Sequence, residues 1–414
     1  MAKKERIELD KKDWTSRFSI TGEAKITDFT YALDQRSEKS DYVYSRLNLS
    51  IDCGEKYGKP NVELMGGYFS EKDGVIYVHG KKEDGSDDFQ NQYTIAFEDR
   101  FDEDILADVG DLCFMTVGLE KTDKGKTFSK KFLSAYDMIA YINEHLEDGM
   151  VITASGQIKY SVYKDSIQCK KEINSIYLAI DKKTGEAVTP DKYKASFTQT
   201  VLIDEDSCTR KSLDKDKSVL VVDAYVLEKF KEYNGYDLTQ NGKVKGGQLV
   251  PLRKQFEFVV DLTTEAGKKK IDAVLNSDKM FKVKKGTVTQ ITFEGEFVEA
   301  GAAVMPTLDD VPDDIKELIE IGVYTEEEAL KACADKGSRE RRMIILKPFT
   351  KKVGDDDDKT TVIAYTPAKY GADDLLFDFL IPKDEDEDEE DADDTVDTDD
   401  DSASEEEEDW LSQL

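Results

Sequence analysis

The sequence is poor in the residues on which most catalytic and metal sites depend. Its 414 residues include only two histidines, His79 and His145, and no H-E-x-x-H or G-x-S-x-G pattern. Histidine metal sites and Ser-His relays therefore have little to draw on. A phosphate loop needs a glycine five residues before the glycine of its Gly-Lys-Thr segment, and Glu120 stands at that place before Gly125. We expect no enzyme activity, no metal and no other cofactor.

Cysteine pairs and long apolar runs are also missing. The five cysteines are odd in number, far apart and never in a C-x-x-C pair, which argues against a zinc knuckle or a disulfide framework. We expect them to be reduced and buried. No apolar run approaches the roughly 18 residues of a membrane span, and the charged start is followed by no apolar signal segment. These absences predict a soluble, unsecreted, cytoplasmic protein without a membrane partner.

Acidic residues are in large excess, and they are unevenly spread. The chain has 90 Asp and Glu against 58 Lys and Arg, a net charge of -32, and residues 384–409 hold 19 acids and no base. A segment of such charge cannot bury enough apolar surface to fold. The rest of the chain can, since the whole sequence is 39% hydrophobic and 10% aromatic. We therefore expect a globular body and a disordered acidic tail over residues 383–414.

The first part of the body reads as strands. Apolar and polar residues alternate with period two, as in half-buried antiparallel strands, and Gly, Lys and Asp turns separate the runs. The expected strands are 15–31, 42–51, 61–69, 75–81, 93–97, 112–119 and 128–133, with a short helix at 102–108. Strands, one short helix and two more strands are the order of a small Greek-key barrel of the OB type. We expect an OB-like β-barrel domain over residues 1–133.

The second part repeats this pattern after a helix. Apolar spacing predicts a linking helix at 134–149, and residues 150–163 form a long strand with Gly156 at the place where a barrel strand coils sharply. Further expected strands are 173–180, 218–222, 255–262, 284–298 and 343–346, with a helix at 264–275. We expect a second OB-like β-domain over 150–382.

Residues 306–341 differ from the strands around them. A proline begins one short helix, and a threonine with a following glutamate, a capping-box pattern, begins another. We expect a helical hairpin inserted before the last strands. The predicted fold class is thus mainly β with some α: tandem OB-like Greek-key barrels, an inserted helical hairpin and a disordered acidic C-terminal tail.

Barrels of this type hold oligonucleotides on a strand face, where aromatic rings stack on bases and Lys or Arg follow the phosphates. Aromatic residues interleaved with basic ones are the candidates for binding single-stranded DNA, and packing in the core is the alternative for each aromatic. The first domain offers Trp14, Tyr31, Arg36, Tyr42, Tyr44, Arg46, Lys56, Tyr57, Lys59 and Tyr68. The second offers Lys159, Tyr160, Tyr163, Lys164, Arg339, Arg341 and Arg342.

The tip of the tail is apolar. A tail that only confers solubility has no use for Trp410, Leu411 and Leu414 directly after a run of acids that ends at Asp409. An acidic stem with an apolar end suits docking, because carboxylates steer it toward a basic patch and the apolar side chains fill a pocket. These four residues are the predicted partner-binding element.

Barrels followed by such a tail resemble single-stranded DNA-binding proteins, particularly those encoded by phages. The stretch from Gly322 to Arg339 resembles a helical segment of the large phage versions. The resemblance implies that the protein coats and protects single-stranded DNA during replication, recombination and repair in the host cytoplasm. It also implies that the tail recruits partner proteins and competes with DNA for the basic groove. Two binding domains make a monomer sufficient.

Two other classes of protein remain open at this point. An acidic tail on a β-rich body also suits a chaperone or DNA mimic that binds basic proteins. The many carboxylates would also serve a metal-dependent nuclease. The sequence does not decide DNA against RNA, the nucleotides covered per protomer, or which aromatics stack.

Overall fold

The computed structural model describes most of the body: residues 7–70, 74–122, 127–163, 166–239, 246–300, 340–354 and 359–376, and the single residues Lys316, Ile319 and Thr325. Several predictions lie outside this part of the chain. They are the tail with its tip, most of the helical insertion at 306–341, and the candidate residues Lys164 and Arg339.

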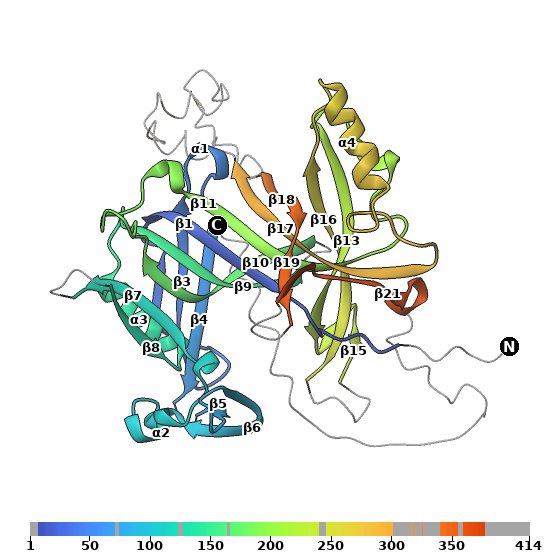
Figure 1. Cartoon of the computed structure of the whole chain (residues 1–414). Helices are drawn as coiled ribbons and strands as arrows, with labels where there is room; N and C mark the ends of the chain where they lie inside the picture. Colours follow the sequence, from blue (N-terminus) through green and yellow to red (C-terminus); the bar gives the residue numbers. More distant parts are fainter. Residues whose placement is uncertain are drawn as a thin grey trace, which may run out of the picture.

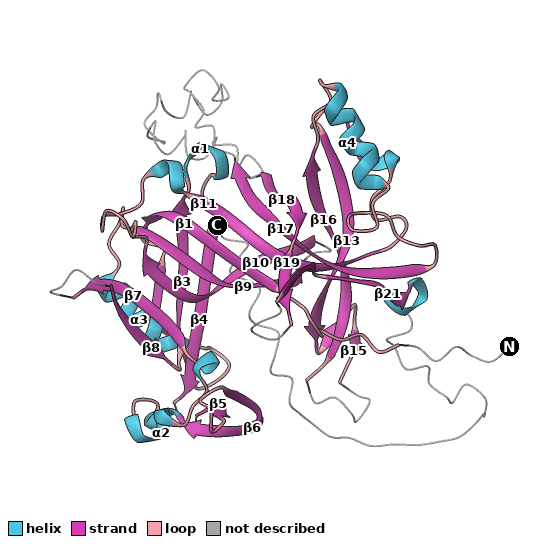
Figure 2. Cartoon of the chain, viewed as in Figure 1, coloured by secondary structure: helices cyan, strands magenta, loops and turns pink. Residues whose placement is uncertain are grey.

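The described part of the chain is mainly β, as predicted (Figure 2). Its first half contains the strands β1 (Ser16–Lys25), β2 (Tyr31–Arg36), β3 (Tyr42–Asp52), β4 (Asn61–Phe69), β5 (Val75–Lys81), β6 (Asp87–Ala96), β7 (Met115–Lys121), β8 (Thr127–Phe132), β9 (Val151–Tyr163) and β10 (Ser166–Leu178). The helices there are α1 (Gly54–Tyr57), α2 (Glu103–Ala107) and α3 (Ala135–His145).

The second half contains α4 (Glu265–Leu275) and the strands β11 (Lys194–Ile203), β12 (Leu213–Asp214), β13 (Val219–Phe230), β14 (Glu232–Tyr233), β15 (Tyr236–Asp237), β16 (Gln248–Val259), β17 (Thr287–Ala300), β18 (Glu340–Pro348), β19 (Thr350–Val353), β20 (Thr360–Ile363) and β21 (Tyr365–Gly371). Short 3-10 turns occupy Phe97–Asp99, Asp111–Cys113, Pro190–Lys192, Arg210–Ser212 and Ala372–Leu375.

Five strands close into a barrel, which we call barrel 1. Around it the order is β1, β3, β4, β10 and β9, which pairs back to β1. All contacts are antiparallel except that of β4 with β10, which is parallel and pairs Glu63 with Glu172. Fully buried aliphatic side chains fill the interior, among them Ile20, Leu47, Leu49, Ile152 and Ile173. This closed five-stranded circuit is consistent with the predicted OB type.

Barrel 1 extends past the expected domain boundary at residue 133. Its fourth and fifth strands are β9 and β10, and α3, expected as a linking helix, instead packs against β3, β4 and β7 of the same body. The hairpin β7–β8, expected to complete the barrel, lies outside it and adds to the edge of β10. Gly66 admits the start of α3, because a Cβ there would clash with Ala135.

A second circuit, barrel 2, repeats the same order. It runs β11, β13, β16, β18 and β17, which pairs back to β11. In both barrels the third strand pairs in parallel with the fifth, and a helix, α3 or α4, precedes the fourth strand. The fourth strand of each carries a glycine beside a register shift in its partner strand, Gly156 in β9 and Gly295 in β17. The sequence therefore encodes a structural repeat.

The first strands of the two barrels pair with each other. β1 and β11 are antiparallel from Ser16 opposite Gln199 to Thr21 opposite Lys194, so the two barrels lie side by side on one continuous sheet (Figure 1). The sequence did not predict β11. Its Gln199 and Thr200 are buried polar residues satisfied by hydrogen bonds to Tyr160 and Thr292, so polar residues do not mark a solvent face there.

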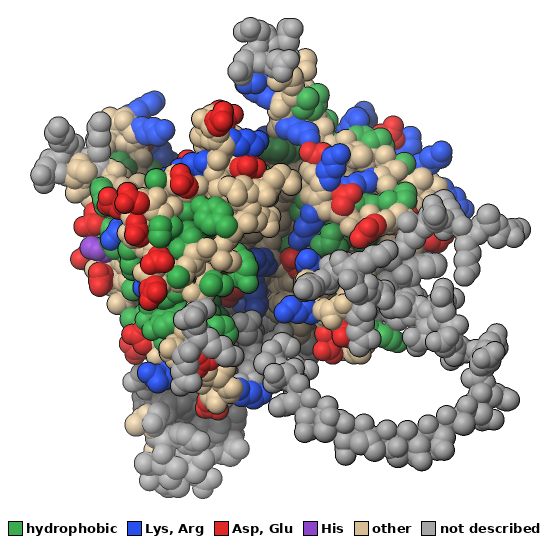
Figure 3. Space-filling view, turned by 90° about the horizontal axis from the view of Figure 1, so that it is seen from below, with side chains coloured by type: hydrophobic (Ala, Val, Ile, Leu, Met, Phe, Trp, Pro, Cys, Tyr) green, Lys and Arg blue, Asp and Glu red, His purple; other side chains and the backbone are tan. Residues whose placement is uncertain are grey.

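Two smaller clusters lie outside the barrels. Leu9 and Trp14, at the N-terminal end, pack with Leu227, Tyr370 and other apolar residues against the outside of barrel 2. Residues 74–114, which we call the hairpin module, contain β5, β6 and α2 and lie at the foot of barrel 1 (Figure 1). Seen from below, hydrophobic and acidic side chains intermingle over the half of the molecule with barrel 1, whereas Lys and Arg are more frequent over the other half (Figure 3).

Candidate nucleic-acid interface

The outward side of β3 carries three of the predicted binding residues. Burial alternates along this strand, with Val43, Ser45, Leu47 and Leu49 inside. Tyr42, Tyr44 and Arg46 therefore share the outer face. Register sets Phe69 of β4 opposite Tyr42, and Met65 opposite Arg46. We call these five residues, Tyr42, Tyr44, Arg46, Met65 and Phe69, the β3–β4 face.

The rings of this face form a row. Tyr42 and Tyr44 have centroids 6.1 Å apart and planes within 16° of parallel, and Tyr42 lies 5.1 Å from Phe69. Phe69 is 42% exposed and Met65 is 38% exposed. Gly67 stands opposite Tyr44, where a Cβ would clash with the carbonyl oxygen of Val43. The glycine thus lets β4 cross closely over β3 and adds no side chain beside the Tyr44 ring.

Basic groups accompany the row. Arg46 lies within the face, and Arg36 is exposed at the end of β2. Lys170 of β10 and Arg46 both interact electrostatically with the carboxylate of Glu63. Burial raises the pKa of Glu63, and Lys170 and Arg46 oppose that rise. Such cations beside exposed rings suit a chain of phosphates and bases.

The loop that follows β1 approaches β3 beyond Arg46, because the carbonyl oxygen of Thr30 accepts a hydrogen bond from the backbone nitrogen of Asn48. This loop carries Phe29, which is 72% exposed. In barrels of the OB type, the corresponding loop helps to bind oligonucleotides. Phe29 was not among the predicted site residues. Its exposure could not be read from a sequence in which most strand aromatics are buried.

Four predicted aromatics are packed inside the molecule instead. The hydroxyl of buried Tyr160 donates to Gln199 over 3.0 Å, and burial raises its pKa far above the usual range. Burial also raises the pKa of Tyr31 to about 12, and its hydroxyl is buried without a hydrogen-bond partner. Trp14 packs outside barrel 2, and Tyr57 is only 8% exposed. These four rings contribute to packing, Tyr160 and Tyr57 as buried residues and Tyr31 and Trp14 as partly buried ones.

The loop with Lys56, Tyr57 and Lys59 connects the two barrels. The hydroxyl of Tyr57 donates to Glu296 of β17 over 2.8 Å, and the Lys56 ammonium lies 3.0 Å from the same carboxylate. Lys59 pairs with Asp52 at 3.4 Å. The glycine-bearing loop that suggested a DNA contact is therefore an inter-barrel contact.

The other predicted residues are dispersed. Tyr68 stacks on Phe97 at 4.6 Å, with planes 17° apart, and joins barrel 1 to the hairpin module. Lys159 pairs with Glu172 at 2.6 Å. Arg342 pairs with Glu257 at 2.7 Å, whereas Arg341 is mostly exposed and 4.0 Å from Glu299.

Barrel 2 has a counterpart of the β3–β4 face that the sequence did not reveal. Tyr225 of its second strand stands opposite Arg253 of its third, with the guanidinium 4.7 Å from the ring centre. Arg253 also pairs with Asp223 at 2.9 Å and with Asp204 at 3.5 Å. The guanidinium of Arg253 is thus paired with two carboxylates.

The described ranges contain neither a metal-binding cluster nor a membrane-spanning helix. No group of three or more His, Cys, Asp or Glu side chains there could hold a metal ion. Within the same residues, no helix is both long and apolar enough to cross a membrane.

Comparison with known proteins gives little. No family model and no curated protein matches the chain. A solved structure, a deletion mutant of the single-stranded DNA binding protein from Thermus aquaticus, is similar with a TM-score of 0.25 and 9% identity, over 69% of this chain and 88% of that chain. A TM-score this low supports no correspondence between residues.

Proposed function

We propose that the protein binds single-stranded DNA across the β3–β4 face and coats and protects it during replication, recombination and repair. The observation that carries the proposal is the row of outward rings, Tyr42, Tyr44 and Phe69, with Arg46 in the same face. Ring faces stack on unpaired bases, each contributing about 1–3 kcal/mol, whereas bases inside a duplex offer no free face.

Barrel 2 extends this surface in the proposal. Its Tyr225 and Arg253 occupy the second and third strands, as Tyr44 and the β4 residues do in barrel 1. The DNA strand that binds barrel 1 would continue onto barrel 2. There its phosphates would replace the carboxylates of Asp204 and Asp223 as partners of the Arg253 guanidinium. One chain would then offer two faces, so that a monomer suffices.

The acidic tail has a regulatory part in the proposal. Residues 383–414 compete with DNA for the basic groups and, once released, present Asp409, Trp410, Leu411 and Leu414 to replication or recombination proteins. The support is the charge of the segment, 19 acids without a base over 384–409, and its apolar tip. The phage origin and cytoplasmic location remain predictions from the sequence.

The test is a fluorescence-anisotropy titration of the full chain and of a chain ending at residue 382. Labelled single-stranded and duplex oligonucleotides are compared at two salt concentrations. We expect both chains to prefer the single strand, with affinity falling as salt rises, and the shorter chain to bind more tightly at low salt. If neither chain binds single strands at low salt, the proposal is wrong, and basic protein partners become the better candidates.

A further inference from the structure

The hairpin module holds a cluster that nucleic-acid binding does not use. His79 of β5 lies with its Nε2 atom 2.7 Å from Oδ1 of Asp87. Its other ring nitrogen, Nδ1, lies 3.2 Å from Sγ of Cys113. The three side chains therefore form a chain of thiol, imidazole and carboxylate, an arrangement in which a base is oriented by a third group and contacts a nucleophile.

The Asp87 carboxylate determines which ring nitrogen of His79 carries the hydrogen. Asp87 also accepts a hydrogen bond from the backbone nitrogen of Leu112 over 2.9 Å, and this bond, with that of His79, holds the pKa of Asp87 below its usual range. An ionised carboxylate only accepts hydrogen bonds. Nε2 of His79 must therefore carry the hydrogen and donate a hydrogen bond to the Asp87 carboxylate. Nδ1 is then the acceptor, and it faces the thiol.

The other described cysteines lack such a base. Burial raises the pKa of Cys53 to about 12 and that of Cys208 to about 12, and it also raises the pKa of Cys169. Cys113 is partly exposed. The backbone nitrogen of His79 also lies 3.4 Å from its sulfur and can donate to it. Cys169 is also partly exposed, so the neighbouring imidazole, rather than exposure, distinguishes Cys113 from the other three.

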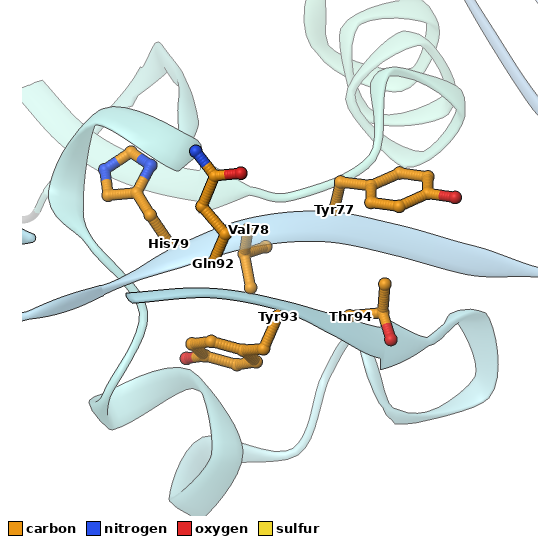
Figure 4. Close-up of a pocket in the computed structure, with 6 residues that line it drawn as sticks. All are labelled: Tyr77, Val78, His79, Gln92, Tyr93 and Thr94. Atoms are coloured by element: carbon orange, nitrogen blue, oxygen red, sulfur yellow. The ribbon is translucent and has the colours of Figure 1, made fainter. Parts of the chain in front are cut away.

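A small molecule has room beside this cluster. His79 lines an open pocket of about 480 Å³ together with Tyr77, Gln92 and Thr94. Tyr77 and Gln92 lie on the same side of the two strands as His79, and Tyr93 on the opposite side (Figure 4). Tyr77 is 82% exposed, and Phe89 packs 4.7 Å from the His79 ring. A reagent with apolar or aromatic parts can therefore approach the imidazole from this pocket, whereas Cys113 does not line the pocket and is partly exposed beside it.

We propose that Cys113 is a reactive thiol, activated by His79 and Asp87, that exchanges with low-molecular-weight disulfides. The thiol proton passes to Nδ1 of His79, and the thiolate attacks one sulfur of the disulfide. A bond forms between that sulfur and Cys113 while the reagent's own S–S bond breaks. The departing thiolate takes the proton from the imidazolium, so that one thiol and one disulfide give one mixed disulfide and one thiol.

Other charged groups lie near the cluster. Asp108, at the end of α2, and Cys113 both interact electrostatically with Tyr93 of β6. Asp111 interacts electrostatically with Asp87, and it is held by Lys81 of β5 and Lys131 of β8, at 3.4 and 3.0 Å.

The test uses the full chain and dithiodipyridine, a small aromatic disulfide whose exchange releases a coloured thione. The rate is followed near neutral pH, and peptide mapping by mass spectrometry assigns each adduct. We expect Cys113 to react at least about tenfold faster than Cys53, Cys169 and Cys208, since an unassisted thiol is only a few per cent thiolate at pH 7. Equal rates for Cys113 and any of these three would overturn the proposal.

Two variants test the roles of the partners. His79→Gln and Asp87→Asn should each slow modification of Cys113 by about tenfold near neutral pH, and the rates should converge with that of the wild type at alkaline pH, where any accessible thiol ionises. A purely structural role would leave the slower rate at every pH. The matched control is His145→Gln, which replaces the other histidine, on α3, and should leave the rate unchanged. Unchanged rates in both test variants would refute the activation.

Discussion

Lys171 of β10 and Glu299 of β17 form an ion pair between the two barrels, with 2.6 Å between Nζ and Oε1. Their side chains are only 6% and 3% exposed. The Lys171 ammonium also lies 4.9 Å from the centre of the Phe297 ring. Because neither charge can be solvated in place, each needs the other, and the pair fixes how the barrels meet.

Replacing one partner should therefore be costly. We expect Lys171→Met to reduce the free energy of unfolding by about 3–5 kcal/mol, because it leaves the buried Glu299 with only the more distant and mostly exposed Arg341, 4.0 Å away, as a counter-charge in the described residues. Adding Glu299→Leu should recover most of this loss. The measurement is the shift of the urea unfolding curve.

The control for this prediction is Lys159→Met. Lys159 and Glu172 also lie 2.6 Å apart, but their side chains are 49% and 38% exposed. We expect a loss of at most about 1 kcal/mol for this solvated pair. A similar loss in both variants would show that burial is not the cause.

Removing a ring from the β3–β4 face should weaken binding of single-stranded DNA. We expect Tyr44→Ala to cost about 1–3 kcal/mol, the contribution of one base stacked on one ring. Arg46→Ala should reduce the steepness of the salt dependence by about one phosphate contact. Anisotropy titrations over a range of salt concentrations measure both. The control is Tyr236→Ala, since Tyr236 is 47% exposed but lies on β15, in a separate two-stranded sheet outside both barrel circuits; an equal loss there would contradict the assignment.

Freeing Arg253 should strengthen binding. Asp204→Asn and Asp223→Asn each remove a carboxylate that pairs with this guanidinium. We expect tighter binding of oligonucleotides long enough to span both barrels and no change for short ones. Glu205→Gln removes the same charge from the neighbouring exposed position and is the control. If it tightens binding as much, the effect is general charge rather than the release of Arg253.

The hydrogen bonds of Asp261, just before α4, should make the stability of the protein sensitive to acid. Asp261 accepts hydrogen bonds from the backbone and hydroxyl of Thr263 and from the hydroxyl of Thr264, and these bonds lower its pKa from 3.8 to about 2. The depressed pKa means that the stabilisation is complete above pH 3.8 and is lost as the pH falls toward 2.

Asp261→Asn removes this dependence. We expect the variant to melt at a lower temperature than the wild type at neutral pH, and the difference to shrink between about pH 4 and pH 2. Thermal melts followed by circular dichroism at several pH values measure it. Asp278→Asn, at an exposed acid that pairs with Lys282, is the control. A difference that stays constant with pH would contradict the assignment.

Much of the fold could be predicted because its strands alternate cleanly. The expected ranges 61–69 and 75–81 coincide with β4 and β5, and Gly156, expected to mark the sharp coil of the second barrel's first strand, lies beside a register shift but in the fourth strand of barrel 1. The grouping of strands into barrels could not be predicted. Whether β7–β8 or β9–β10 follows β4 in the circuit depends on contacts far apart in sequence, which periodicity does not report.

The candidate site could likewise be predicted only in part. Alternation alone placed Tyr42, Tyr44 and Arg46 on one face, as the structure shows. It failed for Tyr31, because β2 has a register shift between Ala32 and Gln35, and for Tyr160, because its outer side is covered by a second barrel. Sequence patterns distinguish the two faces of a strand but not whether another domain covers one of them.

The pairing of β1 with β11 has a consequence for how the chain is made. At about 5–20 residues per second, a ribosome exposes β1 many seconds before β9 and β11, its two long-range neighbours. During that interval the edges of an apolar strand are open to other nascent chains. Cells that make the protein rapidly should therefore require holding chaperones until the midpoint of synthesis has passed.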